Sequence, residues 1–376
     1  SCLTPDGAAA RACLLSALTD ILWQAASAPD TTKTDPADGT AWPIEPCAVV
    51  ALPSLPPGTS DSHTVFVEVF KQCNVGYSWQ ATRALLEARE ERLASPVGAL
   101  CFLCSSLFSR RLGRFNAERD DATPPLIDPH FGHCCQEVLN LMILGQGVSN
   151  LFDGERDLGG GFLLRGVSSR PPVGLLSEME ALRYLAVGSL YKQPLCPVWV
   201  VASQSHFSVL FSLSAAVLRT SHLEALEERL LRAFSEYDSE GNGFISAEHL
   251  PSLSASLPEW STPPLEELRA VLDPEGTSLL VWDTFLQVMR PLHPEFASAM
   301  AAQPHKEGLP PKVFSLLHYN GLASAGHAHK RALRHVTVRT GEARGQPMAD
   351  AGLAAVLQTR WKDASIGWHG TAPSIN

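Results

Sequence analysis

The sequence lacks a membrane-length apolar run, a signal peptide and any excess of basic residues. A membrane helix needs about 20 consecutive apolar residues, and the longest candidate, at 198–218, is broken by Gln204, His206 and five serines. Lys and Arg number 29 against 39 Asp and Glu, which gives a net charge of -10. Phosphate neutralisation requires clustered Lys and Arg. We therefore expect neither a membrane nor a nucleic acid as partner.

The cysteines do not form the even, regular pattern of a disulfide framework. The nine cysteines are Cys2, Cys13, Cys47, Cys73, Cys101, Cys104, Cys134, Cys135 and Cys196. Several lie within apolar runs, as at residues 98–104. We expect reduced, mostly buried thiols in a cytosolic or nuclear protein.

The 376 residues are 45% hydrophobic, which is enough for a sizeable core. This favours one large domain with an insertion over several equal domains. The chain starts at Ser1 without a methionine, and an apolar helical pattern begins almost at once, at residues 8–25. An opening so close to core residues leads us to expect further chain upstream.

Hydrophobic periodicity predicts most of the other elements. Helices are expected near 78–93 and at 96–108, 136–144 and 177–186, strands at 47–52 and 313–319, and a hairpin from 197–202 and 206–211. Residues 220–291 predict two helix-loop-helix units. We expect residues 109–121 to be charged and exposed, 150–161 to be loop and 294–311 to be a linker.

His206 is the candidate catalytic residue. It begins a short strand in which Phe207, Val209 and Phe211 share one face. His206 and Ser208 share the other face. If the apolar face is buried, the imidazole points into a cleft, where it can take a proton from a thiol. The alternative is a structural histidine at a turn, and the strand pattern alone favours that alternative.

Five runs of sequence carry a resemblance to a known family. They are 139–154 (LNLMILGQGVSNLFDG), 174–184 (GLLSEMEALRY), 198–211 (VWVVASQSHFSVLF), 318–322 (HYNGL) and 357–361 (LQTRW). In content and order they resemble the MINDY deubiquitinases, which are cysteine proteases that cleave polyubiquitin. The helix-loop-helix insertion after the histidine strand is similar to the branch of that family with an EF-hand-like module.

The resemblance implies an α+β fold: a papain-like cysteine peptidase with an inserted helical EF-hand-like module. It assigns residues 1–219 and 294–376 to the catalytic domain and 220–293 to the insertion. It implies hydrolysis of isopeptide bonds in polyubiquitin, with a preference for the lysine linkage that marks proteins for the proteasome. It makes His206 the general base, ubiquitin and polyubiquitin the partners, and the nucleus and cytoplasm the location. No cofactor is expected.

In this family the nucleophile is the cysteine of a Gly-Pro-Cys motif that begins a long apolar helix, where the helix N-terminus lowers the thiol pKa. That helix precedes the one expected at 8–25. We therefore expect the nucleophile upstream of Ser1 and no ubiquitin cleavage by this chain alone. Cys47, in the string EPC at 45–47, is the competing candidate. The prolines between 53 and 57 prevent the required helix, and Cys47 follows the first helix instead of preceding it.

Cys134 and Cys135 lie beside His130 and His133 near an expected helix start. They can be interpreted as metal ligands or as reactive thiols. A zinc site needs four suitably spaced ligands, and the nearest other cysteine pair, at 101 and 104, lies on an apolar helix. We interpret Cys134 and Cys135 as buried structural thiols.

Residues 238–249 follow part of the EF-hand loop pattern. Asp238, Glu240 and Asn242 occupy loop positions 1, 3 and 5, and Gly243 occupies the sharp-turn position. His249 replaces the bidentate glutamate of position 12, so calcium loses two oxygen ligands. A second loop, at 273–284, departs further from the pattern. A calcium sensor and a structural pair without an ion are both possible interpretations. The missing ligands favour the second, and we expect no metal.

Three functional classes follow. The first is a deubiquitinase, supported by the five runs and His206. The second is a catalytically inactive ubiquitin-binding pseudoenzyme, supported by the absent Gly-Pro-Cys motif. The third is a calcium-binding adaptor, supported only by the loop that begins at Asp238.

Overall fold

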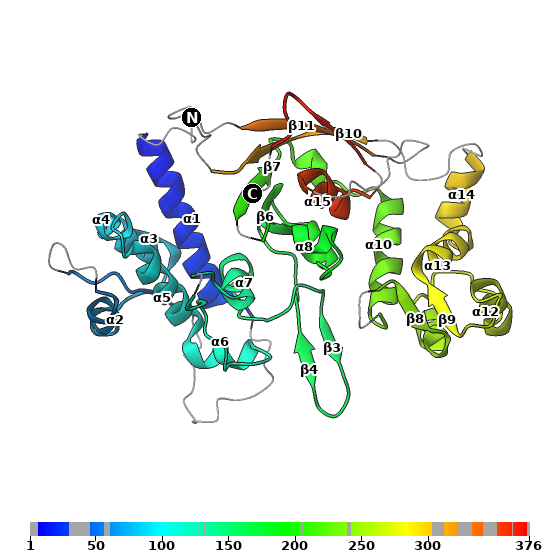
Figure 1. Cartoon of the computed structure of the whole chain (residues 1–376), viewed down its shortest axis with the longest axis horizontal. Coiled ribbons are helices and arrows are strands. Elements are labelled where there is room, and N and C mark those ends of the chain that lie inside the picture. The colour runs from blue at the N-terminus through cyan, green and yellow to red at the C-terminus, as the bar shows by residue number, and fades with distance from the viewer. Residues whose placement is uncertain are drawn as a thin grey trace. The chain divides into compact units, whose positions relative to one another are not determined.

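The computed structural model describes residues 7–29, 46–55, 61–130, 132–204, 206–238, 242–302, 312–321, 333–340, 352–362 and 364–373. Ser1, Cys2 and Glu240, which are named above, lie outside these residues, as does the last residue of the run at 318–322. The chain divides into two compact units, one of residues 1–150 and 157–167, the other of residues 151–156 and 168–376. Helices and strands occur in both, so the fold class is α+β (Figure 1). The predicted functional division at residues 219 and 293 stays a prediction.

The first unit is mainly helical. Its elements are α1 (Ala8–Ser27), β1 (Ala48–Val50), α2 (Ser62–Lys71), β2 (Asn74–Gly76), α3 (Trp79–Glu87), α4 (Glu90–Leu93), α5 (Gly98–Arg110), α6 (Leu112–Glu118), α7 (Gln136–Leu144) and β4 (Leu163–Arg165). β1 and β2 pair antiparallel, and β4 pairs with β3 (Glu155–Asp157). Leu22, Val50 and Leu86 lie in its main core.

Several helix ends follow directly from local sequence. The Ser78 side chain accepts a hydrogen bond from the Ala81 amide at the start of α3, and Asp61 does the same for Thr64 at the start of α2. α7 ends at Gly145, whose left-handed backbone (φ 74°) suits glycine. The predictions of α1, α5 and α7 from periodicity are confirmed.

The prediction that residues 109–121 are an exposed charged segment is wrong. α6 forms there, and both Arg110 and Glu118 are fully buried and paired with each other. Arg110 also donates to the Ala28 carbonyl oxygen (2.6 Å), and Glu118 accepts from the Gly147 amide (2.7 Å). A buried charge is tolerated when it is paired and hydrogen-bonded. This pair therefore joins α5 and α6 to the end of α1 and to the turn after α7.

The second unit is built on a six-stranded sheet in the order β12-β11-β10-β7-β6-β5. Its strands are β5 (Gly174–Ser177), β6 (Val198–Ala202), β7 (Phe207–Phe211), β10 (Lys312–Tyr319), β11 (Arg334–Thr340) and β12 (Ser365–Trp368). β5 and β6 are parallel, and the other neighbours are antiparallel. The predicted hairpin of β6 and β7 and the predicted strand β10 are confirmed.

One face of this sheet is covered by helix α15 (Gly352–Arg360), which packs near β5 and the short helix α8 (Glu178–Ala181). Trp199 of β6 meets Trp361 edge to face, with ring centroids 5.5 Å apart. Phe314 of β10 packs on the same indole. Leu210 of β7 and Leu316 of β10 belong to this core cluster. Both strands therefore contribute apolar side chains to it.

A second core belongs to paired helical elements. They are α10 (His222–Ser235), β8 (Phe244–Ser246), α11 (Leu250–Ala255), α12 (Leu265–Leu272), β9 (Leu279–Val281), α13 (Trp282–Met289) and α14 (Pro294–Ala302). β8 and β9 pair antiparallel, with Ile245 opposite Leu280. Ser221 and Glu224 form a capping box at the start of α10. The two predicted helix-loop-helix units are confirmed, whereas the predicted linker at 294–311 is wrong over α14.

Two other predictions need correction. Residues 150–161 are not all loop, because β3 lies within them. The helix predicted at 177–186 is shorter: α8 ends at Ala181, and Arg183 has a left-handed backbone (φ 64°) that interrupts a helix. α9 (Ser189–Lys192) follows separately.

Candidate active site

His206 lies directly before β7, at the end of the tight turn that joins it to β6. The Ser203 amide donates to the His206 carbonyl oxygen (2.9 Å), and the His206 amide donates to the Ser203 hydroxyl (3.1 Å). The Gln204 amide lies 3.4 Å from a carboxylate oxygen of Glu178, a mostly buried residue at the start of α8. The backbone around His206 is thus held by Ser203 in the same turn and by Glu178 of the neighbouring helix α8.

The His206 ring is oriented by the backbone of the adjacent strand. Its Nε2 atom lies 2.5 Å from the carbonyl oxygen of Asn320, which follows β10 directly. A carbonyl oxygen can only accept, so Nε2 carries the hydrogen and the neutral ring has its lone pair on Nδ1. Sequence reasoning did not identify the group that orients His206, because residues 206 and 320 become neighbours only through the pairing of β7 with β10.

The predicted orientation of β7 is wrong. Phe207 and Val209 are 47% and 37% exposed, whereas Ser208 and Leu210 are almost completely buried. The face shared by His206, Ser208 and Leu210 is therefore the inward one. The reason is tertiary: the neighbouring strands bury apolar residues on that face, and Leu210 joins the same cluster. His206 itself is half-buried, since it lies at the end of the strand.

A second histidine, His318, lies close to His206 on the neighbouring strand β10. His318 of β10 is opposite Leu210 and is only 1% exposed. Its Nε2 atom lies 2.9 Å from the Ser208 hydroxyl. Burial, together with the neighbouring His206, lowers the pKa of His318 to about 4. The His318 ring is therefore neutral at neutral pH.

The chain is similar to known deubiquitinases over most of its length. Residues 1–230 match the family described as "Deubiquitinating enzyme MINDY-3/4, conserved domain". The chain belongs to the MINDY-3/4 family. It is 35% identical over 285 residues to "Ubiquitin carboxyl-terminal hydrolase MINDY-3" of Homo sapiens, covering 74% of this chain and 60% of that protein.

More distant relatives give the same picture. The chain is 32% identical over 289 residues to the MINDY-3 homolog of Drosophila melanogaster, covering 76% of this chain and 49% of that protein. It is 34% identical over 224 residues to "Probable ubiquitin carboxyl-terminal hydrolase MINDY-4" of Mus musculus, covering 57% and 28%. The chain therefore spans about 60% or less of these relatives' length. No solved structure matches it.

Within this MINDY-3/4 chain, Cys47 does not begin a helix. It precedes strand β1, is half-buried, and has its sulfur 4.0 Å from a guanidinium nitrogen of Arg111. Cys47 therefore does not have the position at a helix start that the sequence analysis expects of the nucleophile.

The prediction that the cysteines are mostly buried is wrong. Cys101 and Cys104 are buried, Cys135 is half-buried, and Cys134 is exposed, as are Cys13, Cys73 and Cys196. Cys135 precedes α7, but burial and a hydrogen bond with Glu137 raise its pKa to about 11. The backbone of Cys134 forms an isolated antiparallel β-bridge with Ile127. This bridge closes a small loop that also contains His130 and His133. The fold thus places Cys134 and Cys135 at a loop-to-helix junction instead of a core.

The two loops of the helical elements are closed by their own aspartates. Asp238 accepts from the amides of Asn242 and Gly243 (3.0 and 2.8 Å). Asp273 accepts from the amides of Thr277 and Ser278 (2.8 and 2.7 Å), at the same spacing along the chain.

Other features of these loops also bear on metal binding. The His249 ring stacks on Tyr237, with centroids 4.9 Å apart. Across the described part of the chain, no group of three or more His, Cys, Asp and Glu side chains is arranged to hold a metal ion. No described helix has the length and apolarity that crossing a membrane requires.

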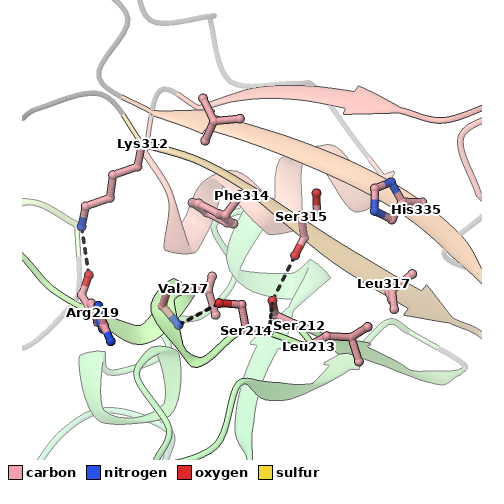
Figure 2. Close-up of a pocket in the computed structure, with 12 residues that line it drawn as sticks. Ser212, Leu213, Ser214, Val217, Arg219, Lys312, Phe314, Ser315, Leu317 and His335 are labelled. Atoms are coloured by element: carbon pink, nitrogen blue, oxygen red, sulfur yellow. Dashed lines mark hydrogen bonds between the residues drawn. The ribbon is translucent and has the colours of Figure 1, made fainter.

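A pocket of about 630 Å³ opens at the far end of β7 from His206 (Figure 2). Residues 212–219 form one wall and the first half of β10 forms the other. The Ser212 hydroxyl donates to the Ser315 carbonyl oxygen (3.1 Å), and Lys312 donates to the Arg219 carbonyl oxygen (3.0 Å). His206 does not line this pocket, so it is not the cleft that the sequence led us to expect.

Proposed function

We propose that this chain provides the general base, His206, of a thiol-dependent deubiquitinase that hydrolyses isopeptide bonds in polyubiquitin. The observation that carries the proposal is the contact between His206 Nε2 and the Asn320 carbonyl oxygen at 2.5 Å. This contact supports the tautomer with the hydrogen on Nε2, which leaves Nδ1 free to act as the base. Membership of the MINDY-3/4 family, whose relatives are named as ubiquitin carboxyl-terminal hydrolases, supplies the reaction class.

The proposed reaction follows the chemistry of thiol proteases. Nδ1 of His206 takes the proton of a cysteine thiol, and the thiolate attacks the carbonyl carbon of the isopeptide bond. The imidazolium then gives its proton to the departing lysine amine, and water hydrolyses the thioester. While the ring is charged, the oxygen of Asn320 stabilises it electrostatically, because the Nε2 hydrogen already points at that oxygen.

We propose that the nucleophile is a cysteine carried upstream of Ser1 in a longer protein. The described thiols support this. Burial raises the pKa of Cys101, Cys104 and Cys135, which disfavours the thiolate. Cys47 precedes a strand instead of a helix. The greater length of the relatives is compatible with the proposal.

The finer family properties are also proposals. We propose a papain-like arrangement, supported by a histidine at the head of an inner sheet strand. We propose that residues 220–293 are an EF-hand-like insertion, supported by the paired loops and the β8–β9 ladder. A preference for the proteasome-targeting lysine linkage, and residence in nucleus and cytoplasm, rest on the family resemblance alone.

The competing function is a ubiquitin-binding pseudoenzyme, which the raised thiol pKa values favour. A ubiquitin probe with a thiol-reactive C-terminus separates the two. We expect no adduct with this chain, and an adduct with a protein extended upstream through the family's Gly-Pro-Cys motif. An extended protein that binds ubiquitin without reacting supports the pseudoenzyme. An adduct on this chain contradicts the upstream nucleophile, and peptide mapping identifies the cysteine responsible.

A further inference from the structure

Two imidazole contacts cross between β7 and β10 in opposite directions. His206, before β7, reaches the Asn320 backbone after β10, at 2.5 Å. His318, within β10, reaches the Ser208 hydroxyl within β7, at 2.9 Å. The pairing of His318 with Leu210 in this antiparallel ladder makes both contacts diagonal neighbours on one face of the sheet. The contact between His318 and Ser208 therefore holds together the strand pair on which the contact between His206 and Asn320 depends.

A histidine at position 318 is energetically unfavourable if its role is only structural. Its side chain is 1% exposed, and its Nδ1 atom has no hydrogen-bond partner among the described residues. Leaving a buried polar atom unpaired carries an energetic cost. A leucine would avoid that cost and would suit the surrounding cluster, which includes Leu210 and Leu316. Packing alone therefore does not account for a histidine here.

We propose that His318 is a positioning residue for His206, acting through Ser208 and the pairing of β7 with β10. The inference rests on the proposed function, in which His206 is the general base. A catalytic group must be held within about 0.5 Å of its productive position. The link from His318 to Ser208 restrains β7 two residues from His206 and restrains β10 two residues from Asn320. The neutral ring adds this restraint without a second positive charge beside the base.

The test compares the wild-type chain with S208A, H318L and H318Q. In S208A and H318L the link is removed, and leucine keeps the volume of the site. In H318Q the side-chain amide can still reach the Ser208 hydroxyl, so this variant is the matched control. The first readout is the exchange rate of the His206 Nε2 hydrogen with water, measured by NMR on histidine-labelled protein. It needs neither ubiquitin nor a nucleophile.

We expect S208A and H318L to speed this exchange roughly threefold to tenfold, the effect of losing one hydrogen bond. H318Q should restore slow exchange, and H318L should keep or raise the thermal midpoint. If His318 has only a structural role, the opposite results are expected: H318L loses thermal stability, and the exchange rate of the His206 Nε2 hydrogen does not change. Equal exchange rates in all four proteins would overturn the proposal.

The second readout is ubiquitin cleavage by the upstream-extended protein carrying the same variants. We expect kcat to fall in S208A and H318L with little change in KM, because the base and not the ubiquitin surface is disturbed. If the extended wild type shows no cleavage, the proposed function fails while the exchange measurement still decides the role of His318. If it cleaves and the variants match it, only the positioning role fails.

Discussion

His206 Nε2 lies 2.5 Å from the backbone carbonyl oxygen of Asn320, a residue 114 positions further along the chain. The contact uses the backbone of Asn320, so it depends on where the chain runs after β10. The next residue, Gly321, has a left-handed backbone (φ 71°). The proposed general base is therefore oriented by the backbone that directly follows the neighbouring strand β10.

This relationship predicts different outcomes at two adjacent positions. Asn320→Ala keeps the carbonyl, so we expect the upstream-extended protein to retain its rate of ubiquitin cleavage within about threefold, the scale of one ordinary hydrogen bond. Gly321→Ala places an L-residue in the left-handed region, at a cost of about 1–2 kcal/mol. We expect it to lower both the thermal midpoint and the cleavage rate. A large loss in Asn320→Ala with none in Gly321→Ala would show that the side chain orients the ring.

The buried His318 predicts a specific dependence of stability on pH. Its pKa falls from 6.5 to about 4 on folding, so between these values the unfolded chain binds a proton that the folded chain does not. Stability is therefore lost as pH falls from about 6.5 to about 4, by about 3 kcal/mol for this group. H318Q removes this contribution. Urea unfolding at pH 7 and pH 4 should show a larger loss for wild type than for H318Q, and equal losses would contradict the burial of a neutral ring.

The buried pair of Arg110 and Glu118 predicts a large effect in the first unit. Glu118→Gln leaves the Arg110 charge uncompensated inside the protein, which costs about 3–5 kcal/mol. Thermal unfolding measures the loss. The control is Asp283→Asn, because Asp283 pairs with Lys362 at 3.2 Å with both side chains 69% exposed. We expect that substitution to cost less than about 1 kcal/mol. Similar losses in both variants would mean that Arg110 is solvated.

The helical elements predict weak or no calcium binding. Asp238 already accepts two backbone amides, and the position-12 residue is His249, stacked on Tyr237. A histidine cannot supply the bidentate carboxylate of a calcium loop. Calorimetric titration should show no micromolar binding in wild type, and His249→Glu should strengthen binding measurably. Micromolar affinity in wild type would support the calcium-sensor interpretation.

Local sequence predicted the elements whose ends are encoded locally. α7 is an example, because its apolar residues and the left-handed Gly145 define it without help from the rest of the chain. Charge patterns were less informative. Arg110 and Glu118 sit in a stretch that looks solvent-exposed, and only the buried carbonyls and amides around them explain their position.

The candidate site also has features that the sequence could predict and features that it could not. The strand pattern alone favoured a structural histidine at position 206, and the family-like runs made His206 the candidate base, a role that stays a prediction. The sequence could not reveal the inward face of β7, because the neighbours β6 and β10 decide which side is buried. Asn320 and His318 were visible only as part of a family-like run. Their roles depend on a strand register between segments more than 100 residues apart.

The most direct test of the central claim is labelling by a ubiquitin probe with a thiol-reactive C-terminus. It compares the upstream-extended protein with His206→Ala in the same background, and thermal unfolding checks that both fold. Loss of a general base should slow adduct formation by about 10²–10⁴-fold while ubiquitin binding is kept. Labelling of His206→Ala at the wild-type rate would contradict the assignment of His206 as the base.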